Sequence, residues 1–261
     1  MNQSSENYAG AALEAINLTK CYEDGVMALD HVSFAVERGQ ILALLGGNGA
    51  GKTTTINLFL NFIEPTEGEA RIDGIVTHLD PLRAKEKVAF VSENVMLYAN
   101  FTAIQNLDFF ARLAGKTDLT RSDYHEVLAR VDLDEQFHDK KLKGYSKGMR
   151  QKCGIAIAIL KDASVILLDE PTSGLDPKAG RDFINLLKSL RSENRAILMS
   201  THDIFRAREV ADSVAIMDRG HLVLSEPVDK LVNQDLEQLY MQYMSGQNGL
   251  GNGGAHAENP H

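Results

Sequence analysis

The sequence predicts an α/β fold with a mostly parallel central sheet, and three observations lead to this prediction. Apolar strands at residues 165–170 and 196–200 are separated by a helical pattern at 178–190, an alternation typical of a parallel sheet covered on both faces. A glycine-rich loop joins an apolar run to a helix at residues 41–55. Between residues 94 and 161 the pattern changes to helical periods, which predicts an inserted helical subdomain.

The composition is compatible with one large domain. The chain has 261 residues, of which 44% are hydrophobic, enough to bury a substantial core. Length alone also permits two small domains, but we favour one domain that carries an inserted subdomain. The net charge of −9 disfavours a broad nucleic-acid-binding surface, so no nucleic-acid partner is expected, although a local basic groove is compatible with it.

Cysteine usage and hydropathy predict a cytoplasmic protein. The two cysteines, Cys21 and Cys153, lie far apart without metal-ligand spacing, which predicts neither a disulfide nor a zinc site and fits a reducing compartment. No apolar run approaches the ~20 residues that span a bilayer. The first ten residues lack the basic-then-apolar order of a secretion signal.

The first part of the chain is expected to form an antiparallel β subdomain after a flexible segment at residues 1–12. Val32, Phe34 and Val36 alternate with smaller or polar residues, as in a strand with one buried face. Ala70 and Ile72 repeat this alternation after a turn at 65–68. The predicted elements here are strands at 15–19, 31–36 and 69–73, a helix at 81–87 and a buried strand at 88–91.

The helical subdomain and the last part of the chain have their own patterns. One helix face is predicted from Leu107, Phe110 and Leu113, and another from Tyr124, Val127, Leu128 and Val131. Strands at 214–218 and 221–224 are predicted to form a hairpin through Arg219-Gly220. An amphipathic helix at 235–244 and a Gly/Asn-rich, disordered tail at 246–261 are expected to follow.

The clearest functional motif is the loop in ILALLGGNGAGKTTT, at residues 41–55. Gly46, Gly51, Lys52 and Thr53 fit the G-x-x-x-x-G-K-[ST] spacing of a phosphate-binding P-loop between a strand and a helix. The glycines let backbone N–H groups turn toward the phosphates, and the helix N-terminus adds its dipole. An accidental glycine-rich turn is the alternative, and the flanking strand and helix signals disfavour it.

This motif implies a ligand that carries β- and γ-phosphates, together with Mg²⁺. Lys52 is expected to reach the β- and γ-phosphates, and the Thr53 hydroxyl to ligate Mg²⁺. The loop residues expected to bind the nucleotide are Gly46, Gly47, Asn48, Gly49, Ala50, Gly51, Lys52, Thr53 and Thr54.

Two further strands are expected to place functional side chains at the same edge of the sheet. Strand 165–170 ends in Asp169 and Glu170, where an open α/β sheet binds its ligands. Asp169 can hold Mg²⁺, and Glu170 can polarise an attacking water. His202 follows the next apolar strand; a lone histidine is usually structural, but this one is expected to face the γ-phosphate. Lys52, Glu170 and His202 are therefore the candidate catalytic residues.

With these motifs the chain resembles the nucleotide-binding subunit of an ABC transporter, over nearly all of residues 13–231. The most specific motif is YSKGMRQK at 145–152, which resembles the ABC signature with Ser146 and Gly148 in the matching places. SGLD at 173–176 resembles the D-loop. The resemblance implies a P-loop NTPase (RecA-like) fold, in an ABC domain at 13–245 whose helical subdomain covers about 94–161.

The resemblance also assigns roles to individual residues. His202 matches the switch histidine. Tyr22 matches the aromatic residue that stacks on adenine, whereas its position at a strand end leaves stacking and simple packing equally open. Ser146, Gly148 and Asp176 are expected to contact the nucleotide held by a second subunit.

The resemblance implies an ATPase that works as a homodimer with membrane permease subunits. Two copies would hold two ATP molecules, each between the P-loop of one copy and the signature of the other, so that hydrolysis is tied to dimer closure. YSKGM and the absence of extra domains look most like subunits paired with ABC-2-type permeases, commonly exporters, on the cytoplasmic face of the inner (plasma) membrane. The alternatives are a soluble ABC ATPase acting on a macromolecular complex and an ATP-binding switch without turnover.

Two residues depart from the family's pattern. Gly47 stands where many relatives have proline, which should loosen the loop slightly. Glu93 aligns with the Q-loop glutamine, and it keeps an oxygen ligand for Mg²⁺ while adding a negative charge beside a polyphosphate. We expect a cation to offset that charge, either Mg²⁺ or a basic residue of the permease. Thr53, Asp169 and Glu93 are the expected Mg²⁺ ligands.

Overall fold

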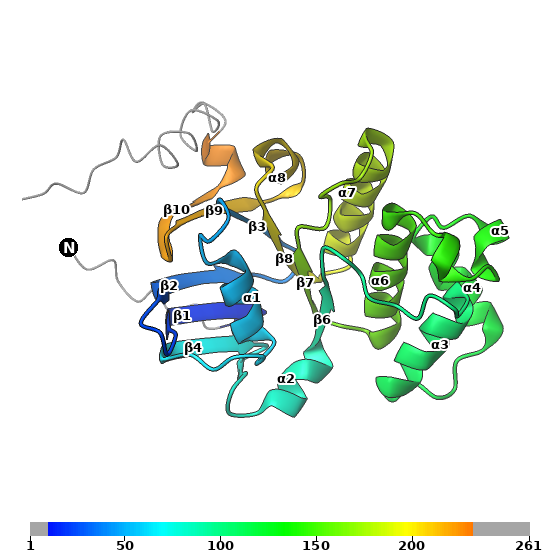
Figure 1. The fold of residues 1–261 in the computed structure, drawn as a ribbon, viewed down its shortest axis with the longest axis horizontal. Coiled ribbons are helices and arrows are strands. Elements are labelled where there is room, and N and C mark those ends of the chain that lie inside the picture. Colours follow the sequence, from blue (N-terminus) through cyan, green and yellow to red (C-terminus); the bar gives the residue numbers. More distant parts are fainter. Residues whose placement is uncertain (1–9, 232–261) are drawn as a thin grey trace, which may run out of the picture.

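The computed structural model describes residues 10–231, which contain two β-sheets (Figure 1). The central sheet has the strand order β10-β9-β3-β8-β7-β6, and the second sheet has the order β2-β1-β4-β5. The strands are β1 Leu13–Cys21, β2 Met27–Val36, β3 Ile41–Leu45, β4 Glu67–Ile72, β5 Ile75–Val76, β6 Val88–Val91, β7 Val165–Asp169, β8 Ala196–Thr201, β9 Ser213–Asp218 and β10 His221–Pro227.

Helices cover the central sheet and form a separate group at one end of the molecule (Figure 1). Helices α3, α4 and α5 lie between strand β6 and helix α6 in the chain, and they form the helical subdomain predicted from the sequence. The helices are α1 Lys52–Phe59, α2 Pro81–Lys87, α3 Ala103–Leu113, α4 Arg121–Arg130, α5 Glu135–His138, α6 Lys147–Lys161, α7 Pro177–Ser192 and α8 Ile204–Val210, with short 3₁₀ helices η1 Leu142–Gly144 and η2 Val228–Leu231.

The central sheet is parallel except at one edge. Strand β3 pairs in parallel with β8 and β9, and β7 pairs in parallel with β6 and β8, while β10 is antiparallel to β9. In this register Leu45 lies opposite Thr201, and Asp169 lies opposite Ser200. The carboxyl ends of β3, β7 and β8 therefore meet at one edge, which confirms the arrangement predicted from the apolar strands.

Successive residues of the central strands contribute to two different cores. In β3, Ile41, Ala43 and Leu45 pack in the cluster that contains residues of α6, α7 and α8. Leu42 and Leu44 pack in the cluster that contains the antiparallel sheet and α1. Because side chains alternate between the faces of a strand, a strand buried on both faces has no polar position. This explains why the sequence of each such strand is continuously apolar.

Within residues 10–231 the predicted element types are confirmed, with one error in a helix face. The β9–β10 hairpin turns through Arg219 and Gly220, whose φ angles of 46° and 84° suit a two-residue turn. Leu113, predicted to share a buried face with Leu107, is instead 73% exposed. Helix α3 instead buries Ala103, Ile104, Asn106, Leu107 and Ala111, so its last residue lies beyond the part of the helix that meets the core.

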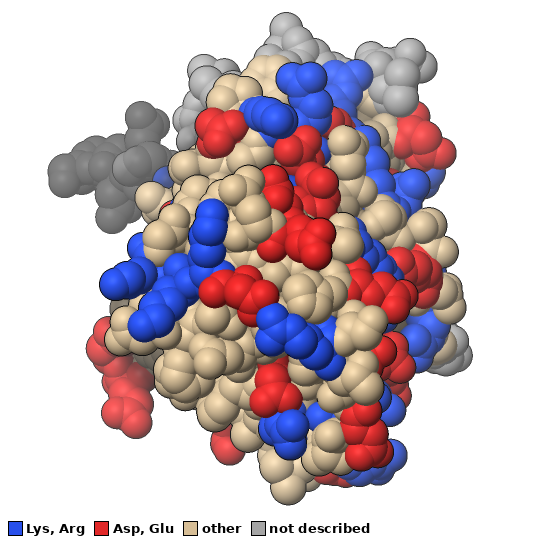
Figure 2. All heavy atoms as spheres, turned by 90° about the vertical axis from the view of Figure 1, so that its right-hand side faces the viewer, with Lys and Arg blue, Asp and Glu red and all other residues tan. Residues whose placement is uncertain are grey.

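Some predictions fall outside the described residues. The helix at 235–244, the tail at 246–261 and most of the flexible segment at 1–12 lie there, although Ala11 and Ala12, at the end of that segment, are buried. Among residues 10–231, no helix has both the length and the apolar composition to cross a bilayer. The face formed by the helical subdomain carries interspersed acidic and basic side chains (Figure 2).

Candidate functional site

A cavity of about 440 Å³ lies against the glycine-rich loop at the carboxyl edge of the central sheet. It gathers eleven of the predicted site residues and three that the sequence did not indicate. The predicted residues that line it are Gly47, Asn48, Gly49, Ala50, Gly51, Lys52, Thr53, Thr54, Glu93, Asp169 and Glu170, and the additional ones are Val26, Met27 and Ala28.

Two glycines of the loop are required by close contacts. A Cβ atom on Gly46 would lie 2.7 Å from the carbonyl oxygen of Met217. Gly51 has a φ angle of 109°, and a Cβ there would lie 2.8 Å from the carbonyl oxygen of Ala28. Any side chain at either position would displace the loop from the strands beneath it. The motif spacing therefore reflects packing as well as access to the cavity.

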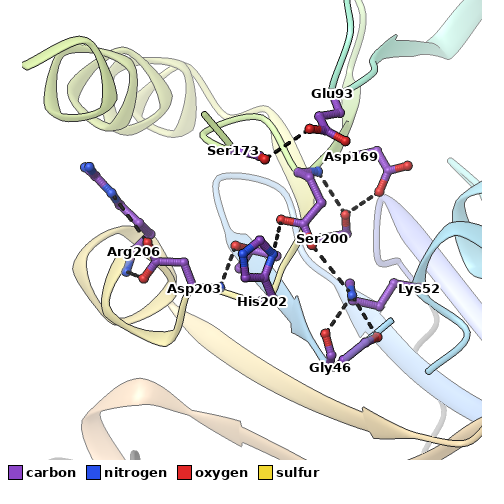
Figure 3. Close-up of polar contacts among 12 residues, drawn as sticks. Gly46, Lys52, Glu93, Asp169, Ser173, Ser200, His202, Asp203 and Arg206 are labelled. Atoms are coloured by element: carbon purple, nitrogen blue, oxygen red, sulfur yellow. Dashed lines mark hydrogen bonds and ion pairs between the residues drawn. The ribbon is translucent and has the colours of Figure 1, made fainter. Parts of the chain in front are cut away.

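Lys52 is held inside the loop although it is a charged residue. Its side chain is only 7% exposed, and Nζ donates to the carbonyl oxygens of Gly46 at 2.6 Å and Gly47 at 3.2 Å. The same nitrogen lies 3.6 Å from Oε1 of Glu170 (Figure 3). The ammonium group is thus fixed at the cavity by the backbone and by one carboxylate.

Asp169 is held by hydroxyl groups from two other elements. Ser200 Oγ donates to Oδ1 of Asp169 at 2.5 Å (Figure 3). Thr53 Oγ1 donates to Oδ2 of Asp169 at 3.3 Å. Ser200 was not among the predicted site residues, and its only sequence signal is a polar residue near the end of the apolar strand β8. The pairing of β7 with β8 places it beside Asp169.

The oxygens around Asp169 fit a magnesium ion that is completed by phosphates. A carboxylate and a hydroxyl are hard oxygen ligands, and Mg²⁺ is usually held by one or two protein groups together with water and substrate phosphates. Within residues 10–231, no three His, Cys, Asp or Glu side chains are placed to hold a metal. Thr53 and Asp169 would therefore hold Mg²⁺ only together with the nucleotide.

Glu170 lies between two nitrogen groups in a strained backbone conformation. Its φ angle of 46° is in the left-handed region, which is uncommon for a residue with a side chain. The backbone N–H donates to the carbonyl oxygen and to Oγ of Ser200, at 3.2 and 3.1 Å. Oε2 lies 2.9 Å from Nδ1 of His202. The strained turn therefore directs the carboxylate toward both Lys52 and His202.

Glu93 contacts a lysine of its own chain. Its Oε1 lies 3.1 Å from Nζ of Lys147 and accepts a hydrogen bond from Ser173 Oγ at 3.0 Å. These two partners hold the pKa of the Glu93 carboxyl below its usual value. The sequence leads us to expect the offsetting cation from Mg²⁺ or from the permease. Lys147 is a further cation beside this carboxylate. Neither Lys147 nor Ser173 was predicted to contact Glu93.

Tyr22 lies apart from the loop cavity. It lines a neighbouring cavity with Lys20 and Glu64, and Nζ of Lys20 lies 5.4 Å from the centre of its ring. Val26 and Met27, a few residues later, line the loop cavity instead, and both side chains are exposed. The sequence contains these two apolar residues shortly after the candidate stacking tyrosine, but it does not show which residue lies closer to the loop.

The signature-like segment forms another separate site. Ser146 caps helix α6 by accepting from the Met149 N–H, and Asp176 caps α7 by accepting from the N–H groups of Lys178 and Ala179. Ser146, Gly148 and Asp176 line a cavity of about 250 Å³ that shares no residue with the loop cavity. One chain therefore does not surround a single ligand with both sets of residues.

Comparisons with known proteins agree with these motifs. The profile of the family described as ABC transporter matches residues 29–173. The ABC transporter ATP-binding protein NatA of Bacillus subtilis is 34% identical over 87% of this chain and 96% of its own length. The bacitracin transport ATP-binding protein BcrA of Bacillus licheniformis is 37% identical over 90% of this chain and 76% of its own length.

Solved structures show the same fold. The ATP-binding subunit of an ABC transporter is 30% identical, with a TM-score of 0.77 over 89% of this chain and 99% of its own. The cassette MJ0796, solved as a dimer in a post-hydrolysis state with ADP and phosphate, is also 30% identical, with a TM-score of 0.73 over 83% of this chain and 98% of its own.

Proposed function

The chain belongs to the ABC transporter family as an ATP-hydrolysing subunit, and we propose that two copies of it close around two Mg²⁺-ATP molecules to drive a membrane permease. The observation that carries this proposal is the position of Glu170. Its carboxylate lies at the loop cavity, 3.6 Å from Lys52 and 2.9 Å from His202. A carboxylate in this position can accept the proton of an attacking water, while the two nitrogen groups face the phosphates.

Each residue at the cavity has a distinct part in this proposal. The loop N–H groups and Lys52 bind the phosphates, and Thr53 and Asp169 hold the metal ion. When bound, Mg²⁺ would supply positive charge that offsets the charge of the phosphates. Ser200 holds the Asp169 carboxylate and the Glu170 backbone at the same time. This serine thereby fixes the position of the metal-binding residue, Asp169, relative to the proposed base, Glu170.

The proposed dimer follows from the separation of the two cavities. Ser146 and Gly148 lie at the N-terminus of α6, where free N–H groups and the helix dipole favour an anion. Because this cavity shares no residue with the loop cavity of the same chain, the signature is proposed to face the γ-phosphate bound by a second copy. The dimeric state of the related cassette MJ0796 supports this proposal.

The proposed permease contact is an exposed aromatic cluster that follows Glu93. Tyr98, Phe101 and Phe109 have neighbouring rings, with centroid distances from Tyr98 of 5.0 Å to Phe101 and 4.9 Å to Phe109. All three are exposed, and a cavity of about 530 Å³ lies beside Phe101 and Phe109. Exposed apolar patches of this kind mark interaction sites. We assign the patch to an apolar cytoplasmic segment of a permease, with the subunit at the cytoplasmic membrane face.

Similarity to a bacitracin transport protein and to a peptide export protein supports export as the direction. An ABC-2-type permease is the proposed partner because the YSKGM signature resembles that of subunits paired with such permeases.

The proposed base is tested with Glu170→Gln, which keeps the size of the side chain but cannot accept a proton. The variant is expected to bind Mg²⁺-ATP and to lose about 10²–10⁴-fold in turnover, the usual effect of removing a general base. It should accumulate as an ATP-bound dimer, detected by size-exclusion chromatography with and without ATP. Glu209→Gln, at an exposed position on α8, is the matched control. Turnover at the wild-type rate in Glu170→Gln would contradict the assignment.

A further inference from the structure

Two side chains of one helix hold Glu93, one by its carboxylate and one by its backbone. Lys147 and Gln151 are four residues apart on α6, so they lie on the same face, one turn from each other. Nζ of Lys147 is 3.1 Å from Oε1 of Glu93. Nε2 of Gln151, which is fully buried, donates to the carbonyl oxygens of Ser92 and Glu93 at 3.1 and 2.9 Å. Glu93 is therefore docked on the first turns of α6.

The turn after Glu170 closes this arrangement. Ser173 Oγ donates to the same oxygen of Glu93 that Lys147 contacts (Figure 3). A Cβ on Gly174 would lie 3.7 Å from Nζ of Lys147, so the ammonium group lies directly over this turn. Three segments that are distant in sequence therefore meet at one carboxylate oxygen.

The charge of Glu93 makes this arrangement important for the loop cavity. Glu93 lines that cavity with Asp169 and Glu170, whereas Lys52 is the only Lys or Arg among its lining residues in the described part of the chain. Lys52 is also 3.6 Å from Glu170. A third carboxylate without a partner would repel a polyphosphate, since like charges at short range are costly.

We propose that Lys147 is a positioning residue for the ATP site of its own chain: with Ser173 it holds the Glu93 carboxylate and offsets its charge at the loop cavity. Lys147 follows Ser146 directly, so it belongs to the segment proposed to face the nucleotide of the partner subunit. The Lys147–Glu93 ion pair thereby connects the signature segment of a chain with the loop cavity of the same chain. This inference rests on the proposed function, because it requires that the loop cavity binds Mg²⁺-ATP.

The inference is tested by removing the cation and then the charge that it offsets. The affinity for Mg²⁺-AMP-PNP, which is not hydrolysed, is measured by calorimetry for the wild type, Lys147→Met, Glu93→Gln and the double variant. Lys147→Met should weaken binding by roughly 3- to 10-fold, as expected for an unpaired, partly exposed charge. Adding Glu93→Gln should restore the affinity to within about twofold of Glu93→Gln alone, because no charge then remains to be offset.

Two further readouts separate this role from a merely structural one. The difference in affinity between Lys147→Met and the wild type should become smaller between about 50 and 500 mM KCl, because salt screens the exposed charge of Glu93. A difference caused by a packing defect would persist. Lys147→Arg keeps the charge and should bind as the wild type does. Lys143→Met, at an exposed position four residues earlier, is the matched control. If Lys147→Met does not melt cooperatively, Lys147→Gln takes its place in the same comparison.

The outcomes are distinguishable. The inference is overturned if Lys147→Met binds Mg²⁺-AMP-PNP with the same affinity as the wild type. It is also overturned if the double variant binds as weakly as Lys147→Met. A wild-type chain that does not bind Mg²⁺-AMP-PNP contradicts the proposed function instead.

Discussion

Glu170 is the residue in which local strain and proposed chemistry coincide. It has a positive φ angle although it is not glycine, and its backbone N–H is held by both the carbonyl oxygen and the hydroxyl of Ser200. Such conformations cost about 1–3 kcal/mol and persist only where the surroundings enforce them. Here the enforced turn places the carboxylate between Lys52 and His202. The strain is therefore the structural cause of the position on which the proposed base depends.

The base of the nucleotide has two candidate contacts, Tyr22 and Met27. If the ring of Tyr22 stacks on the base, Tyr22→Ala should lose about 1–3 kcal/mol of ATP affinity while Tyr22→Phe stays nearly neutral. Met27 lines the loop cavity and is 49% exposed, whereas Tyr22 lines the neighbouring cavity. Equilibrium binding of ATP to Tyr22→Ala, Tyr22→Phe and Met27→Ala decides between them. A loss of ATP affinity in Met27→Ala alone would place the nucleotide base beside β2 and show that Tyr22 does not contact it.

At the scale of elements, glycines set how closely neighbouring segments approach. On α6, a Cβ on Gly154 would lie 3.1 Å from Cγ1 of Val91, and a Cβ on Gly148 would lie 3.3 Å from Cβ of Ala179. The helix therefore packs close to the end of β6 on one side and to the start of α7 on another. This close packing brings Lys147 and Gln151 within reach of Glu93.

The start of β4 depends on a glycine for two separate reasons. Gly68 has a φ angle of 78°, and a Cβ there would lie 2.2 Å from the carbonyl oxygen of Asn17 on β1. Gly74, with a φ angle of 74°, would meet no atom within 4 Å. Gly74→Ala is expected to cost about 1–2 kcal/mol of unfolding free energy from backbone strain alone, and Gly68→Ala clearly more. Urea denaturation of both variants measures the difference, and equal losses would show that β1 moves aside freely.

At the scale of the whole molecule, the loop cavity and the aromatic cluster are linked through the segment that follows Glu93. This segment leaves strand β6, passes Glu93 at the cavity and reaches Tyr98 at the cluster. Asn106 on α3 fixes the Tyr98 backbone by accepting from its N–H at 2.8 Å and donating to its carbonyl oxygen at 3.1 Å. Helix α3 therefore holds the Tyr98 end of the segment, while Gln151 of α6 holds the Glu93 end.

The aromatic cluster is expected to bind the permease without serving ATP hydrolysis. Phe109→Ser should leave the ATPase rate of the isolated subunit unchanged, because Phe109 lies outside the residues that line the loop cavity. The variant should fail to retain a membrane protein from solubilised membranes of cells that express the chain, as identified by mass spectrometry. Phe205→Ser, at another exposed aromatic residue on α8, is the control. Equal retention by both variants would show that the permease binds elsewhere.

Much of the fold and part of the candidate site could be predicted, because their signals are local. The P-loop is contiguous, and the helix at 81–87 and the strand at 88–91 occur with the predicted bounds. Asp169 and His202 could be assigned to one edge because both follow apolar strands of a parallel sheet. The buried face of α3 was predicted wrongly at Leu113, since periodicity gives the faces of a helix but not which part of a face meets the core.

The sequence by itself therefore determined most of the elements in their order, the P-loop motif, the two acids at the end of β7 and the family. These features depend on spacing along the chain, which short-range geometry converts directly into structure. Only the tertiary structure decided that Ser200 holds Asp169, that Met27 rather than Tyr22 lines the loop cavity, and that Lys147 lies beside the Glu93 carboxylate. Such contacts join residues 31 to 54 positions apart. Their formation depends on how closely α6, β7 and β8 pack, and no local periodicity encodes that distance.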